Sequence, residues 1–192
     1  MQESSKNIFN HLKIHTQYSI CEGAIKIEDL KNFCKENKIK SAGLSDTYNL
    51  CGSLEFSENL AKSGTQPIIG TQILFNFKND VGLLSLIAKS ESGYKRIMEL
   101  SSKSYLDNDK NLEPQCRFKD LLDKPNDIIL LSGSINGLIG KLFNKGKFSE
   151  IEEIYKTIKE TYKDNFYIEI QRHNDLNEKS FENYNLNLSN KF

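Results

Sequence analysis

The chain has 192 residues, of which 38% are hydrophobic and 27% are charged. It contains 26 Lys and Arg residues and 26 Asp and Glu residues, so its formal net charge is zero. A dedicated nucleic-acid or membrane-surface module would carry a strong basic excess, and this balance argues against both classes. The length suits one domain with a hydrophobic core.

The N-terminus and the cysteines indicate the compartment. Residues 1–6 contain no apolar signal core and the longest apolar runs are short, so we expect neither secretion nor a membrane span. No Cys-x-x-Cys pair occurs, which argues against a zinc knuckle or a disulfide framework. We therefore expect a cytoplasmic protein with four reduced thiols, Cys21, Cys34, Cys51 and Cys116.

Short β-rich runs alternate with helical patterns along the chain. We expect strands over residues 8–15, 41–45, 67–77, 83–88, 127–131 and 166–171. Two helical stripes lie between them, one through Ile27, Leu30, Phe33 and Cys34 and a less regular one through Leu54, Phe56, Leu60 and Ala61. The clearest amphipathic helix carries Phe148, Ile151, Ile154, Ile158 and Tyr162, and its charged outer face should be solvated.

This alternation predicts an α/β fold with a mostly parallel sheet, and the number of strands favours a barrel at least as much as an open sheet. Residues 106–115 are polar and indicate a loop. We expect a single domain over residues 1–192, because no repeat, linker or composition shift marks a boundary. A weak helical pattern follows Glu178 and stops at Phe192 without a Gly or Pro, which suggests that the chain continues.

Three stretches carry residues suited to chemistry at the ends of strands. In the first, His11, Lys13 and His15 share one face of a predicted strand, and two His at this spacing are more often structural than metal ligands. In the second, Asp46 ends an apolar strand and is a candidate ligand, base or helix N-cap, of which spacing favours the cap. In the third, residues 130–140 form a glycine-spaced turn that lacks a phosphate-binding signature, so a packing turn is favoured over a phosphate cradle.

Six stretches together resemble the N-terminal PHP (polymerase and histidinol phosphatase) domain of bacterial DNA polymerase III alpha subunits. They follow the family's order over nearly the whole chain, and they read HLKIHTQYSICEGA, LSDTYNLCGSLEF, QPIIGTQILF, LLSLIAKSESGYKRIMELSSKSYL, IILLSGSINGLIG and NFYIEIQRHNDLNE. The resemblance implies a PHP-type distorted (β/α)7 barrel. That barrel would be C-terminally incomplete here, with its final strand and the polymerase domains beyond Phe192.

The resemblance also implies a metal site that has decayed. Metal-binding members hold two or three divalent ions with His and carboxylate ligands, and these ions activate water for phosphoester hydrolysis. When the family's ligand positions are carried over one by one, three of them still hold a residue that can bind a metal: His15, Glu22 and His173. The other positions, or their neighbours, hold Lys13, Asp46, Thr47, Gln72, Leu83 and Ser134. Because a multinuclear site needs many donors at fixed geometry, we predict no intact metal site, no cofactor and no catalytic residue.

Lys13 stands where active members have the first His of a His-x-His pair. One interpretation is that its ammonium replaces the charge of a metal ion and partly neutralises Glu22 and Asp46, because buried carboxylates without a counter-charge are costly. The other is that Lys13 reaches solvent along its aliphatic stem. The sequence favours neither interpretation over the other.

The resemblance implies a module of the replicative DNA polymerase, a DNA-directed nucleotidyltransferase whose polymerase active site lies in later domains. We expect the module itself to be non-catalytic and to serve as a structural platform. Its partners would be the proofreading exonuclease subunit, for which it is a docking site, and other replisome proteins, while the later domains contact DNA. The alternative is an active metal-dependent phosphoesterase or 3′–5′ exonuclease of the same fold, and a third possibility is an unrelated (β/α) enzyme.

Overall fold

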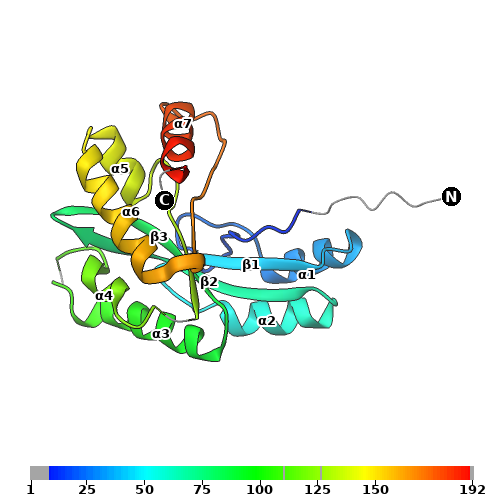
Figure 1. Cartoon of the computed structure of the whole chain (residues 1–192). Coiled ribbons are helices and arrows are strands. Elements are labelled where there is room, and N and C mark those ends of the chain that lie inside the picture. The colour runs from blue at the N-terminus through cyan, green and yellow to red at the C-terminus, as the bar shows by residue number, and fades with distance from the viewer. Residues whose placement is uncertain (1–8, 110, 126, 191–192) are drawn as a thin grey trace. The chain divides into compact units, whose positions relative to one another are not determined.

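The computed structural model describes residues 9–109, 111–125 and 127–190 (Figure 1). In chain order the elements are α1 (Ile27–Glu36), β1 (Ser41–Thr47), α2 (Ser53–Lys62), β2 (Gln66–Phe77), β3 (Asp80–Ala88), α3 (Glu91–Leu106), β4 (Gln115–Arg117), α4 (Phe118–Leu122), β5 (Ile128–Leu131), α5 (Leu138–Asn144), α6 (Phe148–Tyr162), the 3-10 helix η1 (Lys163–Asn165), β6 (Phe166–Tyr167) and α7 (Glu178–Ser189). The chain forms two compact units, Met1–Thr71 and Gln72–Phe192, and each is described by itself below.

The first unit is built on one apolar cluster. Helices α1 and α2 pack against each other and against β1, and the cluster comprises Ile27, Leu30, Cys34, Ala42, Leu44, Phe56 and Leu60. Both predicted helical stripes are therefore confirmed, although Phe33 and Leu54 are 53% and 71% exposed. Burial of an amphipathic face supplies most of the stability of helices as short as these.

The segment before α1 lies beside β1 without forming the continuous strand that we expected over residues 8–15. Residue 8 lies outside the described residues, and the rest makes isolated parallel bridges, including Ile14 to Leu44. The amide of Ile14 donates to the Gly43 carbonyl at 2.9 Å, and Gly43 donates to His11 at 2.7 Å. A Cβ on Gly43 would lie 2.5 Å from the Leu12 carbonyl oxygen, so only glycine permits this approach.

In the second unit, β2 and β3 form a tight hairpin. Its two turn residues, Lys78 and Asn79, have φ of 46° and 72°, as a two-residue type I′ turn requires. Strand β3 also pairs antiparallel with β5, whereas β5–β6 and β2–β4 are parallel. The sheet is therefore mixed: the two-residue turn makes β2 and β3 antiparallel, because it is too short for a parallel crossover.

Six strands pair in the order β1-β2-β3-β5-β6, with β4 beside β2. Among the described residues this path is open and does not close into a ring, and the incomplete PHP-type barrel that the resemblance implied stays a prediction. The chain is a mixed α/β protein. Strand β6 has two residues instead of the six expected over 166–171, and the predicted loop over 106–115 ends in the short strand β4.

The C-terminal helices follow the predicted pattern closely. Helix α6 buries Ile151, Ile154, Ile158 and Tyr162, and the Tyr162 hydroxyl donates to the Leu121 carbonyl at 2.7 Å. The weak pattern after Glu178 is helix α7, which buries Phe181 and Leu188. A search of the described residues finds no helix long and apolar enough to cross a membrane.

Candidate functional site

Asp46 is the centre of a hydrogen-bonded cluster in the first unit. It lies in β1 with no exposed surface, and its carboxylate accepts three hydrogen bonds. The Thr16 amide and the Ser19 hydroxyl donate to Oδ1 at 2.6 and 2.8 Å, and the Thr16 hydroxyl donates to Oδ2 at 2.7 Å. These bonds tie the turn that follows the first extended segment to the end of β1, across about 30 residues of sequence.

His15, Glu22 and Thr47 lie beside this cluster. The Thr47 hydroxyl donates to Glu22 Oε2, and the Thr47 amide donates to the Ser19 hydroxyl oxygen at 3.1 Å. His15 Nδ1 lies 3.3 Å from that hydroxyl oxygen and 3.6 Å from Glu22 Oε2. Within this unit the fold thus gathers four of the residues that the sequence singled out: His15, Glu22, Asp46 and Thr47.

Thr16 and Ser19 were missed by the sequence analysis. Both are buried polar residues, with 0% and 1% exposure, in the stretch Thr16-Gln17-Tyr18-Ser19. A run of hydroxyl residues directly after an extended segment is typical of turns closed by side-chain hydrogen bonds, and that signal could have found them.

One expectation for this unit needs correction. Asp46 is not a helix cap. Helix α2 begins at Ser53, its N-cap residue is Gly52, and no side chain caps it. The Asp46 carboxylate is bound by Thr16 and Ser19, and the Glu22 carboxylate is bound by the Thr47 hydroxyl and lies beside His15. Hydroxyl and backbone donors therefore contribute to satisfying both acids, and the two interpretations of Lys13 stay open.

Tyr18 anchors the same turn to α2. Its hydroxyl donates to Glu55 Oε2 at 2.6 Å, and its carbonyl accepts a hydrogen bond from the Asn49 side chain at 2.9 Å. The hydrogen bond to Glu55 raises the pKa of Tyr18 above its usual value, because ionising the phenol would lose that bond. The turn is thus held from β1 and from α2, which leaves its polar groups fixed in position.

The second unit holds the remaining predicted positions. Gln72 is buried, and Ser85 Oγ lies 3.4 Å from its Oε1. Leu83 is a half-buried hydrocarbon side chain on β3 and offers no donor atom for a cation. Ser134 is half-buried, and its hydroxyl oxygen accepts a hydrogen bond from the Asn136 amide at 3.2 Å. At these three former ligand positions the chain therefore has an amide, a hydrocarbon, and a hydroxyl that is hydrogen-bonded within its own turn.

The glycine-spaced turn around Ser134 is a packing feature. Gly133 has a φ of +82°, which favours glycine, and a Cβ on Gly140 would lie 2.1 Å from the Ile135 carbonyl oxygen. The helix that follows, α5, has seven residues. Close backbone contact accounts for the glycines, in agreement with the packing turn that the sequence favoured.

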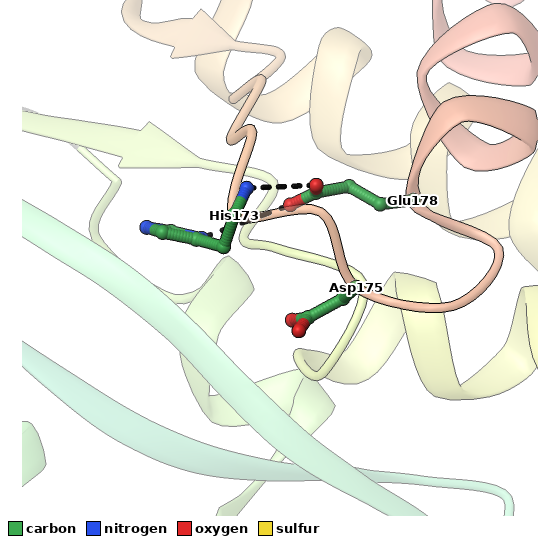
Figure 2. Close-up of side chains that lie close together, drawn as sticks. All are labelled: His173, Asp175 and Glu178. Carbon is green, nitrogen blue, oxygen red and sulfur yellow. Dashed lines mark hydrogen bonds and ion pairs between the residues drawn. The ribbon is translucent and has the colours of Figure 1, made fainter.

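His173 lies in a different cluster of ionisable groups, at the start of α7 (Figure 2). The amides of His173 and Asn174 donate to Glu178 Oε2 at 2.8 and 2.9 Å, and His173 Nδ1 lies 3.7 Å from Glu178 Oε1. Asp175 lies beside them, and one ligand atom from each of His173, Asp175 and Glu178 falls within 4.8 Å of the others. The sequence analysis identified His173 but missed the two acids, which come two and five residues later.

A comparison with models of protein families matches residues 11–173 to the PHP domain. The chain is a member of the PHP domain family. This PHP chain is 35% identical over 186 residues to the DNA polymerase III subunit alpha of Caulobacter vibrioides, covering 90% of the chain. It is 35% identical over 176 residues to the same subunit of Rickettsia felis, and 33% identical over 181 residues to that of Borreliella burgdorferi.

The PHP chain spans only a small part of these relatives. It covers 16%, 14% and 16% of the Caulobacter, Rickettsia felis and Borreliella proteins. Among solved structures, a putative metal-dependent phosphoesterase from Bifidobacterium adolescentis has a TM-score of 0.41 and 16% identity, covering 50% of this chain and 32% of that one. The family assignment rests on the sequence matches.

Proposed function

We propose that this chain is the N-terminal PHP module of a bacterial replicative DNA polymerase alpha subunit, and that residues 1–192 form one cytoplasmic PHP domain of the distorted (β/α)7 type. The match of residues 11–173 to the PHP domain supports this proposal. So does the 35% identity to polymerase III alpha subunits over 90% of the chain. In that context the nucleotidyltransferase activity belongs to the polymerase as a whole.

The module itself is proposed to be non-catalytic. The observation that carries this proposal is the state of Asp46, whose carboxylate is buried and accepts three hydrogen bonds from Thr16 and Ser19. A carboxylate has about four lone-pair sites, so these three hydrogen bonds leave at most one for a metal ion, and Asp46 could not bridge two ions without losing a donor. The replacements at Lys13, Gln72, Leu83 and Ser134 point the same way, because none is a normal ligand of a catalytic divalent ion.

A PHP module that has lost its hydrolytic activity but keeps its fold can still bind other proteins. We assign it the role of a structural platform that docks the proofreading exonuclease subunit and meets other replisome proteins. Its zero net charge supports protein contact over a tight grip on DNA, since phosphate contacts are made mainly by basic residues.

One observation favours the alternative, an active metal-dependent phosphoesterase or 3′–5′ exonuclease. His15 Nδ1 and Glu22 Oε2 lie 3.6 Å apart and are about half-exposed or less, so two retained ligand types remain near each other. In this alternative the pair would bind an ion with ligands that the family pattern does not anticipate.

Two assays separate these functions. The purified chain is incubated with Mn²⁺ or Zn²⁺ and either p-nitrophenyl phosphate or 3′-labelled DNA, beside the double variant His15→Ala/Glu22→Gln. We expect equal background rates from both proteins, and turnover that the double variant abolishes would establish the phosphoesterase. Size-exclusion chromatography with the proofreading exonuclease subunit from the same organism should show a complex, and separate elution at micromolar concentrations would contradict the docking role.

A further inference from the structure

The outer face of helix α3 presents apolar side chains to solvent. Its inner face packs against β3 and β4 and buries four residues: Gly93, Ile97, Leu100 and Ser104. On the opposite face Met98 and Leu106 are 45% and 82% exposed. They form one row with the exposed Ser102, because residues four apart in sequence lie one above the other on a helix. Large apolar side chains grouped on one exposed face are typical of an interaction surface.

A second row on the same face alternates in charge. It consists of four residues at four-residue spacing: Lys95, Glu99, Lys103 and Asp107. Both rows line a shallow groove of about 600 Å³. The ion pairs of the charged row are local: Lys95 with Glu91 at 2.6 Å, Glu99 with Arg96 at 2.9 Å, and Lys103 with Asp120 at 3.0 Å and Asp107 at 3.7 Å. Solvent-exposed pairs contribute little to stability, so these charges can also serve a partner molecule.

The two rows are complementary to themselves when two copies of α3 run antiparallel. A two-fold axis exchanges the copies, so residues at equal distances on either side of the centre face each other. With the centre between residues 101 and 102, Lys95 faces Asp107 of the second copy, and Glu99 faces Lys103.

The apolar row follows the same symmetry. Met98 faces Leu106 of the second copy, and the small side chain of Ser102 lies at the crossing point, where it allows the helices to approach closely. A parallel pair in register would instead place like charges opposite each other. The order of charges along α3 therefore selects a second, antiparallel copy of the same helix.

We propose that the outer face of α3 is a self-association surface, through which two copies of this chain form an antiparallel helix pair about a two-fold axis. One helix from each copy makes an interface at the small end of the known range, so the dimer is weak and forms with increasing concentration. Opposite charges fix the register of the pair. The surface uses no residue of the Asp46 cluster, and it does not depend on the non-catalytic role proposed above.

Sedimentation equilibrium of the 192-residue chain from micromolar to millimolar concentration tests this surface. The buffer contains a reducing agent, because the exposed Cys21 and Cys51 could otherwise cross-link two copies. We expect an equilibrium between monomer and dimer. Lys95→Glu and Asp107→Lys should each weaken the dimer by about tenfold or more, because each substitution turns both Lys95–Asp107 attractions of the dimer into repulsions.

An equimolar mixture of the two variants tests the antiparallel register. In a mixed dimer the new glutamate faces the new lysine, and the native Asp107 of one copy faces the native Lys95 of the other. Both contacts are then attractive, so the mixture should associate as tightly as the parent while each variant alone is weakened. Circular dichroism checks that both variants keep the helix content of the parent.

Lys62→Glu on α2 is the matched control. The Lys62 side chain is 69% exposed and pairs with Glu58 four residues earlier, just as the Lys95 side chain is 68% exposed and pairs with Glu91. This variant should associate as the parent does. The proposal is overturned by any of three results: a parent that stays monomeric up to millimolar concentration, a mixture no tighter than its separate variants, or a control weakened as much as Lys95→Glu.

Discussion

Replacing Thr16 by Val tests the hydrogen-bonded cluster around Asp46. Valine has nearly the shape of threonine, and it keeps the backbone amide that donates to Asp46 Oδ1 at 2.6 Å. It removes the hydroxyl that donates to Oδ2 at 2.7 Å, at a position with no exposed surface. A hydrogen bond to a charged group contributes about 1.5–3 kcal/mol to stability, so we expect the free energy of unfolding to fall by that amount.

Thr65→Val is the matched control. Thr65 belongs to the same unit and is equally buried, but its hydroxyl donates to the uncharged carbonyl of Ile39 at 2.9 Å. Loss of a neutral hydrogen bond costs about 0.5–1.5 kcal/mol. Urea unfolding of the three proteins, followed by circular dichroism at pH 7.5, should rank Thr16→Val as the less stable variant. Equal midpoints for the two variants, or a Thr16→Val protein as stable as the parent, would refute the reasoning.

Two further outcomes follow from buried or paired titratable groups. Hydrogen bonds from Lys145 and Lys147 hold the pKa of the buried Asp80 below its ordinary 3.8, so their stabilisation is present above pH 3.8 and is lost as the pH falls through the lowered pKa. Urea unfolding should therefore show that Asp80→Asn is less stable than the parent at pH 7. The difference between the two unfolding midpoints should shrink below pH 3.8, and a difference that does not change with pH would contradict this reasoning. Burial raises the pKa of the Cys34 thiol and raises that of Cys116 to about 12. Ellman's reagent at pH 8 should therefore modify the exposed Cys21 and Cys51 quickly, and Cys34 and Cys116 only when the protein unfolds. Equal reaction rates for all four thiols would contradict this expectation.

The elements that the sequence predicts well are those whose signal is local. Helix α6 places Ile151, Ile154 and Ile158 on one face, and that spacing alone indicated both the helix and its buried side. The β2–β3 hairpin was missed because its turn residues, Lys78 and Asn79, lack the glycine that usually marks a type I′ turn. That single turn reverses the chain direction, and it places an antiparallel pair within the sheet.

For the cluster around Asp46, the sequence predicted several of the residues but not the contacts between them. The resemblance drew attention to His15, Glu22 and Asp46, and the fold brings all three together within the first unit. The role of Asp46 depends on Thr16 and Ser19, which lie 30 and 27 residues away in sequence. A single sequence contains no periodicity or motif for hydrogen bonds of that range, so the spacing suggested a helix cap instead.

Anomalous X-ray scattering from crystals of the chain grown with MnCl₂ tests the central claim, that the former metal-binding positions no longer hold a catalytic cluster. We predict no manganese peak at His15 and Glu22. A pair of ions about 3.5–4 Å apart, the spacing of two-metal hydrolases, with His15 and Glu22 among their ligands would contradict the account.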